Sequence, residues 1–184
     1  PISHYVRMLR ITYEIVKTLT PDSYVALGGI GYPSFLDAIL RNTDNPHNGD
    51  VSGDYPLKGG AYFDVVSWHY YPHVDEAFKE WNNDRQDFDY YRYSDAAYDE
   101  FIERKKVFDG VLNARGYNGN QHPRKLHINT ETNLPRKEIL SANSAGGNQL
   151  QANYTLKAMF AAQAVGLDHL HMYHIGEKRD IGNV

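Results

Sequence analysis

A chain of 184 residues, of which 41% are hydrophobic and 23% charged, is long enough to bury the core of one globular domain, which we expect over residues 1–184. The formal net charge of −4 gives no electrostatic reason to bind nucleic acid, and no apolar run approaches the ~20 residues of a membrane span. The absence of cysteine excludes disulfides and thiolate metal sites. The first residue is Pro1 rather than Met, and we expect the natural start to have been removed or to lie upstream. We also expect a secreted or periplasmic location.

The first third of the chain predicts a helix, a short strand and a second helix. Apolar residues at helical spacing predict an amphipathic helix over 3–19, with Ser3 as its N-cap. The apolar run Tyr24–Gly29, closed by glycines, predicts a buried parallel strand. A second helix is predicted over 35–41, with Pro33 in its first turn. We expect the first helix to leave an apolar face exposed, where a missing part of the fold would dock.

A second strand is predicted over 63–72, and its period of two separates the side chains onto two faces. Trp68 and Tyr70 share one face, whereas His69 and Tyr71 share the other. The polar face reaches the end of the strand, as expected where a barrel interior becomes a binding site at its mouth.

The later elements continue the alternation of strands and helices. A short helix is expected around 74–81 and a clear amphipathic helix over 95–114. A further helix, with apolar residues around it, is expected over 148–165 and is ended by Gly166. A final strand is predicted over 169–174. This order predicts an α/β fold in which helical crossovers join parallel strands.

The strand predicted over 126–133 ends in a carboxylate, Glu131. Alternation places Glu131 on one face with His127 and Asn129. A Glu at the end of a strand is costly to bury, and in a βα barrel the C-terminal strand ends form the active-site face. Glu131 is therefore a candidate catalytic residue; the alternative is a solvated residue just past an ordinary strand.

Together, four segments resemble the C-terminal half, strands five to eight, of the clan A glycoside hydrolases, which are retaining (βα)8 barrels. The segment ending at Gly28-Gly29 resembles their fifth strand, and the D-x-x-S-x-H-x-Y pattern from Asp64 to Tyr71 resembles the sixth. The Thr130-Glu131 pair resembles the motif of the seventh strand, and 166–173 resembles the eighth. The resemblance implies a parallel (βα) half-barrel, part of a TIM (βα)8 barrel.

The resemblance also implies roles for particular residues. Glu131 would be the nucleophile of a glycosidase acting on a poly- or oligosaccharide, and would form a covalent glycosyl-enzyme intermediate. Tyr71 would hydrogen-bond that carboxylate, and Tyr173 would stand where the family commonly has Trp. No cofactor or metal is implied. The expected substrate-binding residues are polar or aromatic and lie near strand ends: Trp68, His69, Tyr71, Asn133 and Tyr173.

One part of the family pattern is missing. The acid/base Glu of this clan follows an Asn at the end of the fourth strand, and no Asn-Glu pair occurs in this sequence. A complete barrel takes about 250 residues and eight βα units. We therefore expect a half-barrel whose partners are the remaining N-terminal half and a carbohydrate substrate, and which is inactive alone because a lone nucleophile cannot protonate the leaving oxygen.

Two alternatives remain open from the sequence. A metal-dependent TIM-barrel hydrolase would use His69, His171, with His169 beside it, and Glu131 as ligands, because imidazole and carboxylate suit zinc. The second alternative is a non-catalytic carbohydrate-binding or structural domain built on a degenerate barrel.

Overall fold

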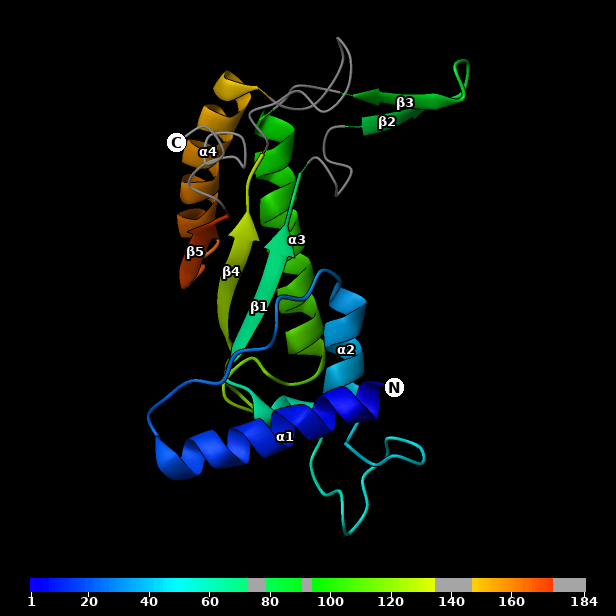
Figure 1. Ribbon diagram of the computed structural model, residues 1–184, viewed down its shortest axis with the longest axis vertical. Coiled ribbons are helices and arrows are strands. Elements are labelled where there is room, and N and C mark those ends of the chain that lie inside the picture. The colour runs from blue at the N-terminus through cyan, green and yellow to red at the C-terminus, as the bar shows by residue number, and fades with distance from the viewer. Residues whose placement is uncertain (73–78, 91–93, 135–146, 174–184) are drawn as a thin grey trace, which may run out of the picture. The chain divides into compact units, whose positions relative to one another are not determined.

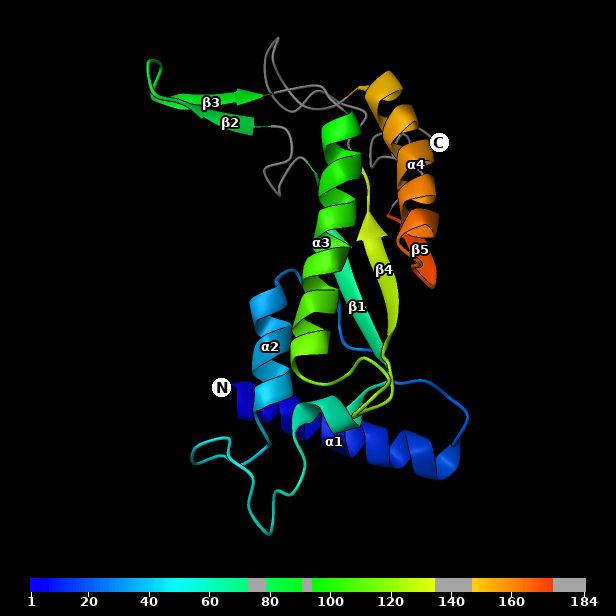
Figure 2. The ribbon, with the colours of Figure 1, turned by 180° about the vertical axis from the view of Figure 1, so that it is seen from behind.

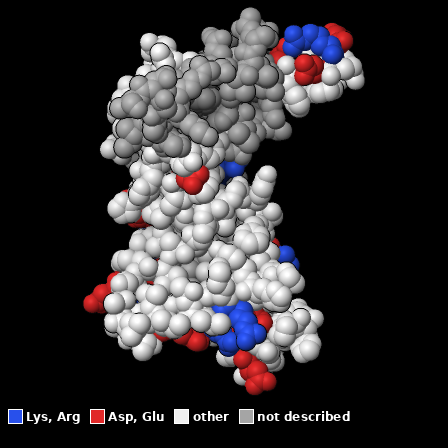
Figure 3. Space-filling view, viewed as in Figure 1, with Lys and Arg blue, Asp and Glu red and all other residues white. Residues whose placement is uncertain are grey.

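The computed structural model describes residues 1–72, 79–90, 94–134 and 147–173 (Figure 1, Figure 3). The chain divides into two compact units, each built from two pieces of sequence: Pro1–Trp68 with Val107–Ile128, and His69–Lys106 with Asn129–Val184. The single domain expected over residues 1–184 stays a prediction. Among the described residues, no helix combines the length and the apolar character that crossing a membrane requires.

The helices expected over 3–19, 35–41, 95–114 and 148–165 are present, whereas the strand expected over 24–29 is reduced to isolated bridges and forms no regular strand. The helices are α1 (Ile2–Leu19), α2 (Pro33–Arg41), the 3-10 turn η1 (Gly59–Tyr62), α3 (Ser94–Ala114) and α4 (Asn148–Ala164). The strands are β1 (Val65–Tyr70), β2 (Lys79–Asn82), β3 (Asp87–Tyr90), β4 (Leu126–Thr132) and β5 (His169–Met172).

The main sheet is parallel and its strand order follows the chain. Strands β1, β4 and β5 are neighbours in that order. On the other side of β1, the segment predicted as the first strand makes parallel bridges at Ala26 to Val65 and at Ile30 to Trp68. Within this sheet each strand therefore lies beside the next sheet member along the chain, with α2, α3 and α4 in the connections, while β2 and β3 form a separate two-stranded sheet. The predicted α/β fold is confirmed.

Helix α3 packs on one face of β1 and β4, as Figure 2 shows from the side of the helix. In the first unit the ring of Trp68 lies 5.7 Å from that of Phe108. In the second unit the ring of Tyr70 lies 5.8 Å from that of Phe101, edge to face. The apolar face of β1 is therefore the helix-facing one, which confirms the predicted division of its side chains and leaves His69 on the opposite face.

Two predicted features of the chain are wrong. Ser3 is not an N-cap, because α1 already begins at Ile2 and Ser3 lies buried inside the helix. The expected short helix around 74–81 is contradicted at its C-terminal end, where β2 and β3 pair antiparallel with Trp81 opposite Phe88. The two rings meet edge to face at 5.1 Å, a cross-strand aromatic pair that favours a hairpin. Residues 73–78 lie outside the described part of the chain.

A buried ion pair joins α1 to the loop that follows α2 in the first unit. Arg10 Nη2 lies 2.8 Å from Asp44 Oδ2, and the Asp44 side chain is 1% exposed. The two groups are close but are not aligned as a hydrogen bond. A carboxylate so deeply buried depends on this partner to offset the loss of water.

A buried amine lies at the start of β4 in the same unit. Lys125 donates a hydrogen bond to the backbone oxygen of Phe63, and its Nζ lies 4.6 Å from the Phe63 ring and 4.8 Å from the Tyr117 ring. Burial lowers the pKa of Lys125 to about 8. This amine is remote along the strand from Glu131, which lies at the other end of β4.

Candidate active site

Strand β4 brings Glu131 to its C-terminal end, and the alternation of its side chains changes there. His127 and Asn129 are buried, but Thr130 and Glu131 are both half-buried, and Thr132 is buried again. The alternation of burial thus slips by one residue between Asn129 and Thr132, since His127 reaches Asp109 on α3 and Thr132 reaches Tyr154 on α4. Glu131 is therefore turned away from the buried face, and the prediction that it shares a face with His127 and Asn129 is wrong.

Two side chains contact Glu131: that of His69, on β1, and that of Tyr71, directly after β1. The Tyr71 hydroxyl donates a hydrogen bond of 2.8 Å to Glu131 Oε2. His69 Nδ1 lies 3.4 Å from the same oxygen. The side chains of His69 and Glu131 are 32% and 34% exposed, so the cluster is reachable from solvent. The sequence prediction that these three residues converge is met by the geometry of the second unit.

The hydroxyl of Tyr71 acts as a donor in this cluster. Burial raises the pKa of Tyr71 well above its usual value, and the hydrogen bond to Glu131 and the charge of that carboxylate raise it further. Tyr71 therefore keeps its proton at neutral pH and presents it to Glu131. Within the described residues both contacts go to Oε2, and Glu131 Oε1 has no hydrogen-bonding partner.

Tyr173 extends the cluster from the end of β5. Its ring centroid lies 6.0 Å from that of Tyr71, with the two rings nearly perpendicular at 88°. Its backbone N–H donates to the Thr132 oxygen at 3.0 Å, which fixes the residue beside the end of β4. The ring is 45% exposed, so an aromatic surface lies open next to Tyr71.

The side chain of Asn133 makes hydrogen bonds within the protein. Its Nδ2 donates to the backbone oxygen of Tyr173 at 2.7 Å, and its Oδ1 accepts the Leu134 N–H at 2.8 Å. Gln151, near the start of α4, approaches the same Oδ1 at 3.4 Å and donates to the Leu134 oxygen. Asn133 therefore ties the end of β4 to the end of β5; its contact with a substrate stays a prediction.

A buried hydrogen bond supports the residue after Glu131. The hydroxyls of Thr132 and Tyr154, the latter on α4, bond to each other, and both side chains are fully buried. Neither Tyr154 nor Gln151 was singled out by the sequence. Both lie on a helix whose periodicity predicts only core packing, so no local signal connects them with the strand end.

Trp68 lies apart from this cluster. Its side chain is fully buried and packs on Phe108, on the face of β1 opposite to His69. A ligand at the strand end therefore has no access to the indole, and the expected contact between Trp68 and a substrate has no support in the geometry.

The ligand set of the metal-hydrolase alternative is not assembled. The part of the chain that the structure describes contains no group of three or more His, Asp or Glu side chains placed to hold a metal ion. His169 and His171 are exposed on β5 with ring centroids 6.3 Å apart, and Glu131 binds Tyr71 and His69 instead. The described geometry gives the metal alternative no site.

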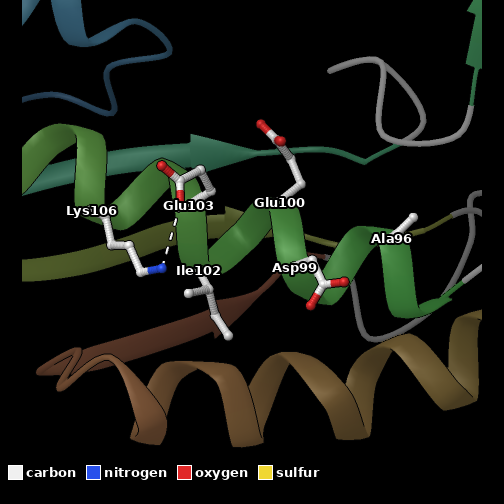
Figure 4. Close-up of a pocket in the computed structure, with 6 residues that line it drawn as sticks. All are labelled: Ala96, Asp99, Glu100, Ile102, Glu103 and Lys106. Atoms are coloured by element: carbon white, nitrogen blue, oxygen red, sulfur yellow. Dashed lines mark hydrogen bonds and ion pairs between the residues drawn. The ribbon is translucent and has the colours of Figure 1, made fainter.

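A shallow groove of about 420 Å³ lies elsewhere, along the outer surface of α3 (Figure 4). Its lining comes from that single helix, and Lys106 pairs with Glu103 across it at 3.4 Å. An acidic helix surface of this kind is expected to be solvated. We assign it no function. The lining residues are Ala96, Asp99, Glu100, Ile102, Glu103 and Lys106.

Comparison with known proteins gives a likeness in structure only. No protein-family model matches the chain, and neither does any curated protein. The thermostable GH51 α-L-arabinofuranosidase of Thermotoga petrophila superposes with a TM-score of 0.54 at 12% identity, over 95% of this chain and 30% of the other. The endo-1,4-β-D-mannanase of the same organism gives a TM-score of 0.44 at 15% identity, over 96% of this chain and 42% of the other.

The chain thus spans less than half the length of either structure that it is similar to. At 12% identity the likeness to the arabinofuranosidase shows the fold and not the reaction. The predicted parallel half-barrel is confirmed at that level. The chain has a glycosidase-like fold, an α/β arrangement that covers part of a (βα)8 barrel.

Proposed function

We propose that this chain supplies the nucleophile, Glu131, to a retaining glycosidase that cleaves O-glycosidic bonds in a poly- or oligosaccharide. The observation that carries the proposal is the convergence of Tyr71 and His69 on one oxygen of Glu131 at the end of a parallel strand. A carboxylate held through one oxygen is oriented while its other oxygen remains available for attack. The glycosidase-like fold supports the same assignment.

The reaction is a double displacement at the anomeric carbon. An oxygen of Glu131 forms a bond to that carbon while the glycosidic C–O bond breaks, and its electron pair stays on the leaving oxygen. The leaving oxygen takes a proton from a second carboxyl group. Water, deprotonated by that second group, then displaces Glu131 and releases the sugar.

Residues of this chain perform the positioning. Tyr71 and His69 hold Oε2, so Oε1 becomes the attacking atom. The exposed ring of Tyr173 offers an aromatic surface to a sugar beside the nucleophile. The second carboxyl, about 5–5.5 Å from the first in retaining enzymes, belongs to the rest of the barrel, since the Asn-Glu motif that carries it in the resembled clan does not occur in this sequence.

Covalent trapping tests the assignment. A longer chain that completes the barrel is incubated with a panel of 2,4-dinitrophenyl 2-deoxy-2-fluoroglycosides. The fluorine slows both displacements, whereas the activated leaving group speeds only the first, so the glycosyl-enzyme accumulates. We expect the added mass of one fluorosugar on the peptide that contains Glu131. The matched variant is Glu131→Gln, which should take up no label.

Other outcomes would contradict the proposal. A label on a different carboxylate would reassign the nucleophile, and a product of inverted configuration would exclude the covalent step. Sugar binding that survives Glu131→Gln, without turnover in any longer chain, would instead support the non-catalytic carbohydrate-binding domain.

A further inference from the structure

Helix α1 carries an exposed apolar stripe in the first unit. Its members follow each other at spacings of three or four residues, which places them on one face of the helix. Their exposed fractions run from 46% to 75%. The members of this α1 stripe are Met8, Ile11, Ile15 and Leu19. The expectation of an exposed apolar face on the first helix is confirmed.

The C-terminal part of the α1 stripe forms a shallow groove. Glu14, Ile15, Thr18 and Leu19 line a hollow of about 320 Å³. Ridges of side chains on a packed helix fit into hollows of this kind. The stripe therefore has the relief of a helix-packing surface as well as its composition.

Helix α4 carries a second stripe, in the other unit. Leu156, Met159 and Phe160, again at spacings of three and four, are 48% to 64% exposed. The opposite face of α4 is buried and includes Tyr154 and Ala158. Helix α4 is therefore apolar on two sides, and the side with Leu156, Met159 and Phe160 is exposed among the described residues.

Helices α2 and α3, which lie between α1 and α4 in sequence, expose far fewer large apolar side chains. Among the described residues, α2 has one large exposed apolar side chain, Phe35, and α3 has one, Val107. Large exposed apolar side chains thus gather on the first and last helices of the series. An even scatter of such residues would be ordinary, but a contiguous stripe marks an interaction surface.

In a closed (βα)8 barrel every helix lies between two neighbouring helices. In a run of units cut from such a ring, only the first and the last helix lack a neighbour. The two stripes lie on those two helices, and the chain spans 30% of the similar arabinofuranosidase. Each stripe, within its own unit, is therefore the uncovered surface expected of a terminal helix in such a run.

We propose that the α1 and α4 stripes bind helices of the remaining βα units of a (βα)8 barrel, and that those units belong to a longer chain of which this one is a part. The occupants are amphipathic helices that present aliphatic ridges, because the exposed members of both stripes are large apolar side chains, with Glu14 in the lining of the α1 hollow. The proposal rests on the fold and does not depend on the chemistry of Glu131.

The absence of cysteine gives a direct test. Ile15→Cys and Phe160→Cys each place one thiol in a stripe, and Val107→Cys is the matched control on α3. Modification by a maleimide, followed by mass spectrometry of the labelled peptide, is compared between the 184-residue chain and a chain extended upstream by its natural coding sequence. We expect the two stripe thiols to react at least tenfold more slowly in the extended chain, and the Val107→Cys thiol to react equally in both.

Two results would overturn the proposal. Equal reactivity of Ile15→Cys in both chains would show that the rest of the protein does not cover the stripe; Leu19→Cys, at a more exposed position, repeats the test if Ile15→Cys fails to fold. A stable dimer of the 184-residue chain in light scattering, lost in Ile15→Lys and kept in Val107→Lys, would make a second copy the occupant instead.

Discussion

The hydroxyls of Thr132 and Tyr154 are hydrogen bonded to each other in the core of the second unit, one residue beyond Glu131. Replacing Tyr154 by Phe leaves the Thr132 hydroxyl buried without its partner. We expect Tyr154→Phe to lower the free energy of unfolding by about 1–3 kcal/mol, the cost of an unsatisfied buried hydroxyl. Urea unfolding measures it.

A double-mutant cycle supplies the control. Thr132→Val removes the other hydroxyl, so the double variant should lose less stability than the sum of the two single variants. Additive effects would show that the two hydroxyls do not depend on each other.

The charge of Glu131 acts on the ionisation of Tyr71. Glu131→Gln removes that charge while keeping the size of the side chain, so we expect Tyr71 to lose its proton at a lower pH than in the unmodified chain. The pKa should still lie above the usual tyrosine value, because burial, the largest cause, remains. NMR of ¹³C-labelled tyrosine, with the signal assigned through Tyr71→Phe, follows the titration. Glu103→Gln, on the surface of α3, should leave the signal unchanged.

Buried Lys125 makes stability depend on pH in the alkaline range. Its pKa falls from 10.5 to about 8 on folding, so between these values the unfolded chain holds a proton that the folded chain has released. The contribution of Lys125 to stability therefore rises with pH from about 8 to 10.5, by about 3 kcal/mol in all. Below pH 8 both states are protonated and the burial cost is constant.

Lys125→Met isolates this effect. The difference in unfolding free energy between the variant and the unmodified chain should favour the variant most below pH 8 and shrink as the pH rises toward 10.5. Denaturant unfolding at a series of pH values gives that difference. A difference independent of pH would mean that the amine is solvated in the folded chain.

The buried ion pair of Arg10 and Asp44 should be sensitive to the loss of either partner. We expect Arg10→Met to destabilise the chain by about 3–5 kcal/mol, because it leaves the Asp44 carboxylate buried without a countercharge. The control is Arg41→Met, which breaks a solvent-exposed pair with Asp37 and should cost about 0–1 kcal/mol. Equal effects of the two substitutions in thermal unfolding would show that the buried pair is hydrated.

Periodicity predicted most of the fold because it reports burial directly. The helices α1 and α3 each present an apolar face at helical spacing, α4 carries apolar residues around it, and the structure reproduces the bounds of all three to within one or two residues. The hairpin of β2 and β3 was missed, since its pairing depends on a contact between Trp81 and Phe88 that neither strand shows alone.

The candidate site was predictable in its members but not in its geometry. Alternation along β1 correctly brought His69 and Tyr71 to one face. It gave the wrong face for Glu131, because the alternation of burial slips by one residue before Thr132 and nothing in the residue types marks that slip. The support from Tyr154 is a long-range contact and has no counterpart in sequence spacing.

The slip in β4 also matters for how this strand is aligned with others. A side chain changes face with every residue in a strand, so the orientation of Glu131 depends on the number of residues that precede it as well as on its identity. An alignment that pairs β4 residue by residue with a strictly alternating strand would match Glu131 to a position on the same side as His127 and Asn129. Such a comparison needs a one-residue gap between Asn129 and Thr132, and deleting Thr130 would be more harmful than replacing it.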